Sequence, residues 1–185
     1  MFIGKSRQRA ALRRRGFSLA EILVGLAIIG LLAAVLIPAV AGQISKGDAT
    51  RAIQDIAAIR SGIEQFVADV HRYPSRLTHL TTPITIAQAD VNDNLYPAGL
   101  VARWKGPYLA RDMTGGYTTG FGAAVVDSLV KVTFGVPYVT LRFVPVTLAD
   151  FERIDLEMDG AVDVANGVLR HGVGDTARFL AMPIQ

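Results

Sequence analysis

The sequence predicts an α+β protein in which a long N-terminal helix, first transmembrane and then amphipathic, packs on a small antiparallel β-sheet. Three observations support this fold class: a charge-free apolar segment at residues 22–45, apolar residues at helical spacing over residues 49–70, and alternating apolar residues in short segments after residue 128. The 185 residues suffice for one domain of ordinary size and a membrane helix. We therefore divide the chain into a basic leader (1–16), a transmembrane helix (17–45), its amphipathic continuation (46–72) and a globular β-rich domain (73–185).

The leader is basic and directly precedes the apolar segment. It contains no acidic residue, and its basic residues are Lys5, Arg7, Arg9, Arg13, Arg14 and Arg15. A basic flank on this side favours a cytoplasmic N-terminus and a C-terminal domain outside the cytoplasm. The apolar run from Ile22 has about 20 residues, the length that spans a bilayer core. It is too long for an ordinary secretory signal and no A-x-A site closes it, whereas a boundary between Gly16 and Phe17 lies before it.

The net charge excludes one class of function. The whole chain has a formal charge of +3, but residues after the leader carry 13 basic and 16 acidic side chains, which gives −3. The body of the protein is therefore not a basic nucleic-acid binder, and we expect no nucleic-acid partner. The chain has no cysteine, which excludes a disulfide framework and a cysteine-based metal site.

Glu21 carries the only charge at the head of the apolar segment. An ionised carboxylate in hydrocarbon costs on the order of 2.5–3.5 kcal/mol at a bilayer centre and less near an interface. An acidic residue in such a place is a candidate functional residue, and we expect a positively charged group to pair with it. We expect that partner to be an α-amine created when the chain is cut after Gly16.

The run from Arg15 to Glu21, followed by an apolar helix that contains Pro38, resembles the class III signal of type IV pilins and type II secretion pseudopilins. The resemblance implies cleavage between Gly16 and Phe17 by a prepilin peptidase, and N-methylation of Phe17. It also implies that Glu21 meets the amine of a neighbouring subunit in a homo-oligomeric filament. Further implied partners are other pilins or pseudopilins, an inner-membrane assembly platform and the membrane itself.

Two small departures from the family pattern accompany this match. Ser18 stands where the family most often has Thr, and Ala20 stands where a bulkier residue is common. The alternative to the resemblance is an ordinary single-pass anchor with an unrelated acid at its cytoplasmic end.

The apolar residues after the membrane segment predict one face of a helix. They recur at alternating intervals of three and four, at Ala49, Ala52, Ile56, Ile59, Ile63, Phe66 and Val70. We expect this stripe to pack on the sheet rather than in a coiled coil, and the helix to end before Tyr73-Pro74. Pro38, Gly42 and Gly47 are its weak points, and the two glycines could allow local melting in a filament.

Two segments after this helix resemble those of major pseudopilins. Residues 71–80, which include Tyr73-Pro74, resemble the link that follows the long helix, and residues 104–109 resemble a W-x-GPYL loop. The segment that usually follows has only a loose counterpart at residues 112–117. We expect glycine and proline to set the turns of the 104–109 loop while Trp104 and Tyr108 bury apolar area.

Period-two alternation predicts three strands, at residues 129–134, 139–143 and 154–158. Residues Gly135 to Pro137 separate the first two, a length that suits a hairpin turn. A short antiparallel sheet packed against the helix stripe buries one face of each strand.

The sequence contains no catalytic motif, and we predict no catalytic residue. The three histidines are far apart, and neither a phosphate loop nor a nucleophile elbow is present. One acidic cluster resembles the start of a calcium loop, with oxygen-bearing residues at alternate positions and glycine sixth; its members are Asp155, Glu157, Asp159, Asp163 and Asn166. The acid expected at the twelfth position is replaced by Asn166. The alternative is the exposed face of a strand that enters an Asp-Gly turn.

These observations predict a structural subunit of a type IV pilus-like filament. The features at residues 71–80 and 104–109 favour a type II secretion pseudopilin that drives protein export, anchored in the inner membrane with its C-terminal domain periplasmic or extracellular. The alternative within the class is a type IV pilus subunit for adhesion, motility or DNA uptake. An alternative of another class is a membrane-anchored sensor or enzyme domain, which an uncleaved and monomeric protein would favour.

Overall fold

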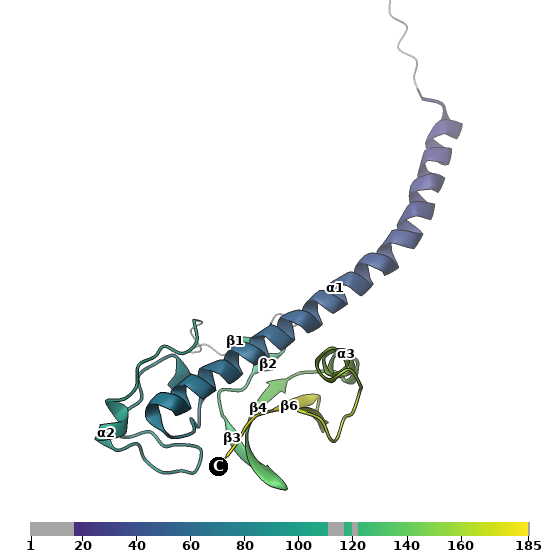
Figure 1. The fold of residues 1–185 in the computed structure, drawn as a ribbon. Helices are drawn as coiled ribbons and strands as arrows, with labels where there is room; N and C mark the ends of the chain where they lie inside the picture. Colours follow the sequence, from purple (N-terminus) through teal and green to yellow (C-terminus); the bar gives the residue numbers. More distant parts are fainter. Residues whose placement is uncertain (1–16, 111–116, 120–121, 185) are drawn as a thin grey trace, which may run out of the picture. The chain divides into compact units, whose positions relative to one another are not determined.

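The computed structural model of the protein describes residues 17–110, 117–119 and 122–184 (Figure 1). The chain divides between Gln43 and Ile44 into two compact units. The first contains the N-terminal half of helix α1, and the second contains the remainder of α1 and all other elements.

Helix α1 runs without interruption from Leu19 to Val70 and has Pro38 inside it. Its end confirms that no helix continues to Tyr73-Pro74, but the terminating residue is His71. The backbone of His71 has φ +59°, a left-handed conformation, and its N–H donates to the carbonyl of Val67 at 2.9 Å. Glycine most often occupies such a position at the end of a helix, so a histidine there could not be predicted to end it.

The predicted apolar stripe of α1 is confirmed. All seven of its residues, from Ala49 to Val70, are at most 5% exposed and belong to the hydrophobic core of the second unit. Ile53 and Val67 pack against the same core and are half-buried. Residues at intervals of three and four share one side of a helix, which is why a single stripe is buried while the other faces stay wet.

The sheet is antiparallel throughout, in the order β1-β2-β4-β6-β5, with β3 paired to β4. The strands are β1 (Tyr117–Thr118), β2 (Ala124–Val125), β3 (Val130–Phe134), β4 (Val136–Val144), β5 (Leu169–Gly172) and β6 (Thr176–Pro183). Together with the α1 stripe this is the α+β fold that the sequence predicts. The first two predicted strands are confirmed as β3 and the C-terminal part of β4.

The hairpin between β3 and β4 is tighter than predicted. Phe134 pairs with Val136, so Gly135 alone makes the turn, at φ +77°, and residues 136 and 137 belong to the strand. The positive φ explains the glycine, because a side chain at this position would be strained.

The strand predicted at residues 154–158 is wrong: these residues lie in helix α3, Leu148–Asp159. Thr147 caps the helix by accepting from the N–H of Asp150, and Gly160 ends it at φ +76°. Phe151 and Ile154 are buried with the spacing of one helix face, whereas Leu156 is 55% exposed. The alternation was therefore a short coincidence, and the capping residues were the better signal.

The predicted aromatic loop is confirmed. It follows two short elements, the 3-10 turn η1 (Leu77–Leu80) and the helix α2 (Ala98–Val101). Trp104 Nε1 donates to the carbonyl of His79 at 2.8 Å, and its ring meets Tyr108 edge to face at 5.7 Å. The Tyr108 hydroxyl donates to Asp69 on α1 at 3.1 Å. A Cβ at Gly106 would lie 2.5 Å from the Trp104 ring, which is why only glycine fits there.

Candidate functional site

The first unit presents an apolar helix surface to its surroundings. The N-terminal part of α1 is long and apolar enough to cross a membrane, and none of its most apolar window is buried inside the structure. Leu19 is 79% exposed, Leu31 72% and Ile37 68%. Apolar side chains on all sides of a helix favour lipid or neighbouring helices over water.

Ser18 and Glu21 form a capping box at the start of this helix. The N–H of Glu21 donates to Ser18 Oγ at 3.2 Å, and the N–H of Ser18 donates to Glu21 Oε2 at 3.5 Å. These contacts satisfy backbone donors that a helix N-terminus leaves free, and the positive end of the helix dipole favours the carboxylate. The spacing S-x-x-E is a capping signal in the sequence itself, although Ser18 was not predicted to have this role.

The structure describes three of the residues predicted to act in processing and assembly, Phe17, Glu21 and Pro38. Gly16 lies outside the described residues. Phe17 is 79% exposed, and Glu21 directs its carboxylate at the backbone of Ser18, the residue next to Phe17. Pro38 lies inside the uninterrupted helix. Cleavage, methylation and the assembly roles of Glu21 and Pro38 stay predictions, as does local melting near Gly42 and Gly47 in a filament.

Comparison with known proteins identifies the family. The family model described as "Prokaryotic N-terminal methylation motif" matches residues 12–37, the segment that carries the resemblance. The type II secretion system core protein G of Pectobacterium carotovorum subsp. carotovorum is 35% identical over 86 residues, which are 46% of this chain and 55% of that protein. The protein of the same name from Klebsiella michiganensis is 33% identical over 101 residues, 51% of this chain and 71% of that protein. The chain belongs to the family of type II secretion system core protein G.

The similarity to core protein G covers only part of each chain. The chain spans about half the length of the first of these relatives, 55% of the Pectobacterium protein and 46% of the one from Escherichia coli strain K12, to which it is 39% identical over 67 residues. Fimbrial protein Q of Moraxella bovis is 39% identical over 51 residues, 28% of this chain and 32% of that protein. No solved structure matches the chain.

Four residues of the predicted calcium loop lie around the loop after α3, and Glu157 points elsewhere; the four are Asp155, Asp159, Asp163 and Asn166. Asp155, Glu157 and Asp159 lie in helix α3, where alternate residues point to different sides, and Glu157 accepts from Thr50 of α1 at 3.3 Å. Asp163 lies in the loop after α3. In the part of the chain that the structure describes, no three His, Cys, Asp or Glu side chains are placed to hold a metal ion.

The carboxylates of this cluster hold the loop after α3 instead. Asp155 Oδ2 accepts from the N–H of Asp163 at 2.8 Å, and Asp163 Oδ1 accepts from the N–H groups of Ala165 and Asn166 at 2.9 and 3.0 Å. Burial raises the pKa of Asp155, and its Oδ1 has no hydrogen-bond partner among the described residues. Calcium binding by these residues stays a prediction.

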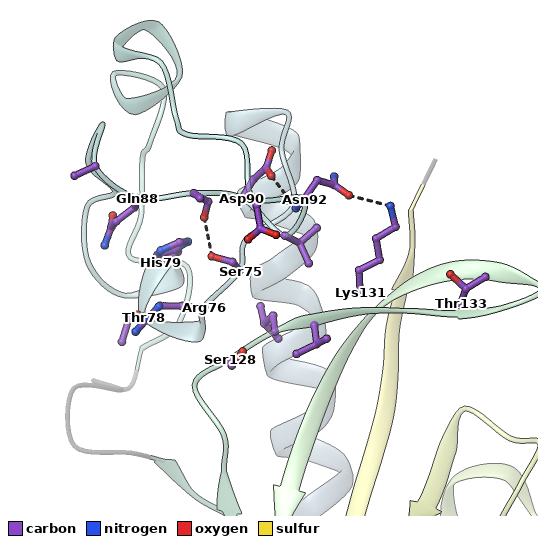
Figure 2. Close-up of a pocket in the computed structure, with 16 residues that line it drawn as sticks. Ser75, Arg76, Thr78, His79, Gln88, Asp90, Asn92, Ser128, Lys131 and Thr133 are labelled. Atoms are coloured by element: carbon purple, nitrogen blue, oxygen red, sulfur yellow. Dashed lines mark hydrogen bonds between the residues drawn. The ribbon is translucent and has the colours of Figure 1, made fainter.

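A polar pocket of about 990 Å³ lies between the segment after α1 and strand β3 (Figure 2). Asp90, which is 1% exposed, organises its wall. It pairs with Arg72 at 3.0 Å and accepts from the N–H groups of Asn92 and Asn94 at 2.8 and 3.1 Å. Lys131 of β3 donates to Asn92 across the pocket at 3.0 Å. These charged and amide groups form hydrogen bonds with one another. We therefore interpret the pocket wall as a network that stabilises the fold.

His79 is among the residues that line this pocket, although its side chain is only 1% exposed (Figure 2). Its Nδ1 is 3.3 Å from the Tyr96 hydroxyl, and the two rings meet edge to face. Burial lowers the pKa of His79 to about 4, with Arg76 adding to the effect and Asp127 opposing it. Burial therefore favours the neutral imidazole, which packs on Tyr96 in the core.

Proposed function

We propose that this chain is a pilin-like subunit of a type II secretion pseudopilus, cleaved after Gly16, methylated on Phe17 and assembled through its N-terminal helix to drive protein export. The observation that carries the proposal is the exposed apolar helix that starts at Leu19, inside a matched methylation motif. The similarity to core protein G over 71% of the Klebsiella michiganensis protein supports the secretion system over other pilin-like machines. The role is structural rather than enzymatic.

Glu21 acts in this proposal as a register device. Apolar contacts alone do not fix the axial position of one helix against another, because lipid is as apolar as a neighbouring leucine. A carboxylate and an amine attract strongly in a low dielectric, and each is costly when unpaired. The amine of Phe17 in a neighbouring subunit is therefore a suitable partner for Glu21.

An intrachain pair is the competing account, and the capping box gives it support. Glu21 Oε2 already lies 3.5 Å from the N–H of Ser18, one residue away from the amine that cleavage would create at Phe17. Both accounts require the cut after Gly16, and they differ in whether the amine belongs to the same subunit.

Three glycines in the N-terminal part of α1 suit close packing between such helices. A Cβ at Gly25, Gly30 or Gly42 would meet nothing within 4 Å in the monomer. Small residues let helix backbones approach closely in a membrane, where packing and not the hydrophobic effect drives association. Copies of the same chain and other pseudopilins are the partners proposed for this surface, after delivery by an inner-membrane assembly platform.

Processing and topology give the first tests. Intact-mass spectrometry of the membrane-extracted protein should find a chain that begins at Phe17 and carries one added methyl group. A reporter fused after Gln185 should be active outside the cytoplasm, since the basic flank precedes the span. A chain that retains residues 1–16, or a fusion active only in the cytoplasm, contradicts the proposal.

Assembly is tested by removing the charge at Glu21. Glu21→Gln and Glu21→Leu should still enter the membrane, because an uncharged side chain is cheaper there, but filament formation should fall sharply. Glu64→Gln removes a surface carboxylate paired with Arg60 and serves as the matched control, which should assemble normally. Assembly of Glu21→Leu at wild-type level would refute both the intersubunit and the intrachain pair. Rescue of its incorporation by wild-type neighbours would favour the intersubunit pair.

A type IV pilus subunit for adhesion, motility or DNA uptake is the second candidate, favoured by the similarity to fimbrial protein Q. Deleting the gene separates the two. Loss of exported proteins from the medium, restored by wild type but not by Glu21→Leu, supports the pseudopilus. Intact export with loss of surface pili supports the pilus instead. If the protein proves to be uncleaved and monomeric, a membrane-anchored sensor or enzyme domain is favoured instead.

A further inference from the structure

Three arginines stand in a row across the C-terminal sheet. Arg142 of β4 pairs directly with Arg178 of β6, and Arg178 pairs directly with Arg170 of β5. Directly opposed residues of antiparallel strands project from the same face, with Cβ atoms about 4.5–5.5 Å apart. The flanking residues Leu141 and Phe179 are buried in the core, so the arginines occupy the opposite, outer face.

The charges of this row are not neutralised by carboxylates. None of the three forms an ion pair within residues 17–110, 117–119 and 122–184. Asp163 interacts electrostatically with Arg170, but its Oδ1 is already bonded to the N–H groups of two loop residues. Arg170 itself donates to the carbonyl of Gly167 and lies 3.8 Å from the centroid of the Phe134 ring.

Two donors in the row are buried and unused. The Nε atoms of Arg142 and Arg178 are shielded from solvent and have no hydrogen-bond partner among the described residues. Like charges on directly opposed residues destabilise a sheet, and a buried donor without an acceptor adds a further cost. An anion placed between these two guanidinium groups removes both costs.

A cavity adjoins the row. It has a volume of about 510 Å³, and its wall includes the three arginines together with Thr176, Val164 and Ala165. The two loop residues come from the segment that the carboxylates of Asp155 and Asp163 hold in place. A cavity of this size falls within the range that small ligands occupy.

We propose that this cavity binds a multivalent oxyanion of the phosphate class, held by Arg142 and Arg178 with Arg170 at its edge. Guanidinium groups are planar forks that present paired N–H donors to phosphate oxygens in a fixed geometry. All residues of the site lie in the second unit, and none belongs to the apolar helix surface proposed for assembly.

The test is a titration of the full chain, in maltoside micelles that carry no phosphate headgroup, with inorganic phosphate at low and constant ionic strength. The side-chain ¹⁵N–Hε resonances of Arg142 and Arg178 should shift and saturate, and the melting temperature should rise with phosphate because the ligand binds the folded state. Arg142→Gln and Arg178→Gln should each weaken binding at least tenfold. Arg153→Gln, which removes the same charge from an exposed pair on α3, should bind as wild type does.

Arg178→Lys provides a variant that keeps the charge in case the glutamine variants do not fold. It should retain saturable binding with lower affinity, because an ammonium group lacks the paired donors. A response that does not saturate, or that is equally weakened in Arg153→Gln, overturns the proposal, since it reflects net charge alone. Resonance shifts that follow protein concentration rather than phosphate would assign the arginines to a carboxylate of a second copy and would also overturn it.

Discussion

We expect His79 to make the folded domain sensitive to mild acid. Its imidazole has a pKa of about 4 in the folded protein against 6.5 in an exposed chain, because it is buried. Between these two values the unfolded chain binds a proton that the folded protein does not bind. The stability contributed by the neutral ring is therefore complete above pH 6.5 and is lost progressively as the pH falls towards 4.

The size of this effect follows from the two pKa values. Lowering the pH from 7 to 5 should reduce the free energy of unfolding by at most about 2 kcal/mol through this one group. For a domain of this length that corresponds to a fall of about 4–8 °C in melting temperature. Tyr96 packs on the ring, and Trp104 donates to the backbone carbonyl of the same residue.

Thermal unfolding of the wild type and of His79→Gln at pH 7 and pH 5 measures the effect. Comparing the two pH slopes cancels contributions that both proteins share, including that of Asp155, whose raised pKa acts in the opposite direction. The variant should be less stable at pH 7 but should lose less stability between pH 7 and 5. His71→Asn, at an exposed position, is the control and should keep the wild-type slope. Equal slopes for wild type and His79→Gln would refute the reasoning.

Three further predictions concern the core and the helix start. Gly106→Ala should destabilise the domain by about 1–3 kcal/mol in urea unfolding, since its Cβ would overlap the neighbouring indole ring, whereas Gly99→Ala, which faces open space, should not. Ile63→Ala leaves a cavity at a fully buried position and should cost about 2–5 kcal/mol in the same assay. Ser18→Ala removes the cap and should weaken the first helical turn by about 0.5–2 kcal/mol, which hydrogen exchange at the Glu21 amide would report.

The sequence predicted correctly those elements whose apolar pattern repeats over many consecutive residues. The α1 stripe repeats over 22 residues, from Ala49 to Val70, so its periodicity could not arise easily by chance. The segment at 154–158 is short, and its alternation of apolar residues fits a strand as well as one side of a helix. Only the cap at Thr147 and the glycine at position 160 distinguish the two, and these lie outside the alternating residues.

Features that depend on strand register could not be predicted. The arginines at 142, 170 and 178 become neighbours only because β4, β6 and β5 pair in one particular alignment. The capping box at the start of α1 is the opposite case. Its residues are three apart in the chain, and the motif could have been recognised before the structure was known.

Asp90 gives the segment between α1 and β1 a practical property. Its carboxylate pairs with Arg72 earlier in the chain and accepts from the N–H of Asn94 after it. These contacts hold the segment in place although it contains little helix or strand. The turn at Ile86 lies outside this anchor, and its side chain is 63% exposed. Exposed turns of this kind accept inserted residues with little disturbance of the core. An epitope or fluorophore tag placed at Ile86 should therefore label the protein while the domain remains folded.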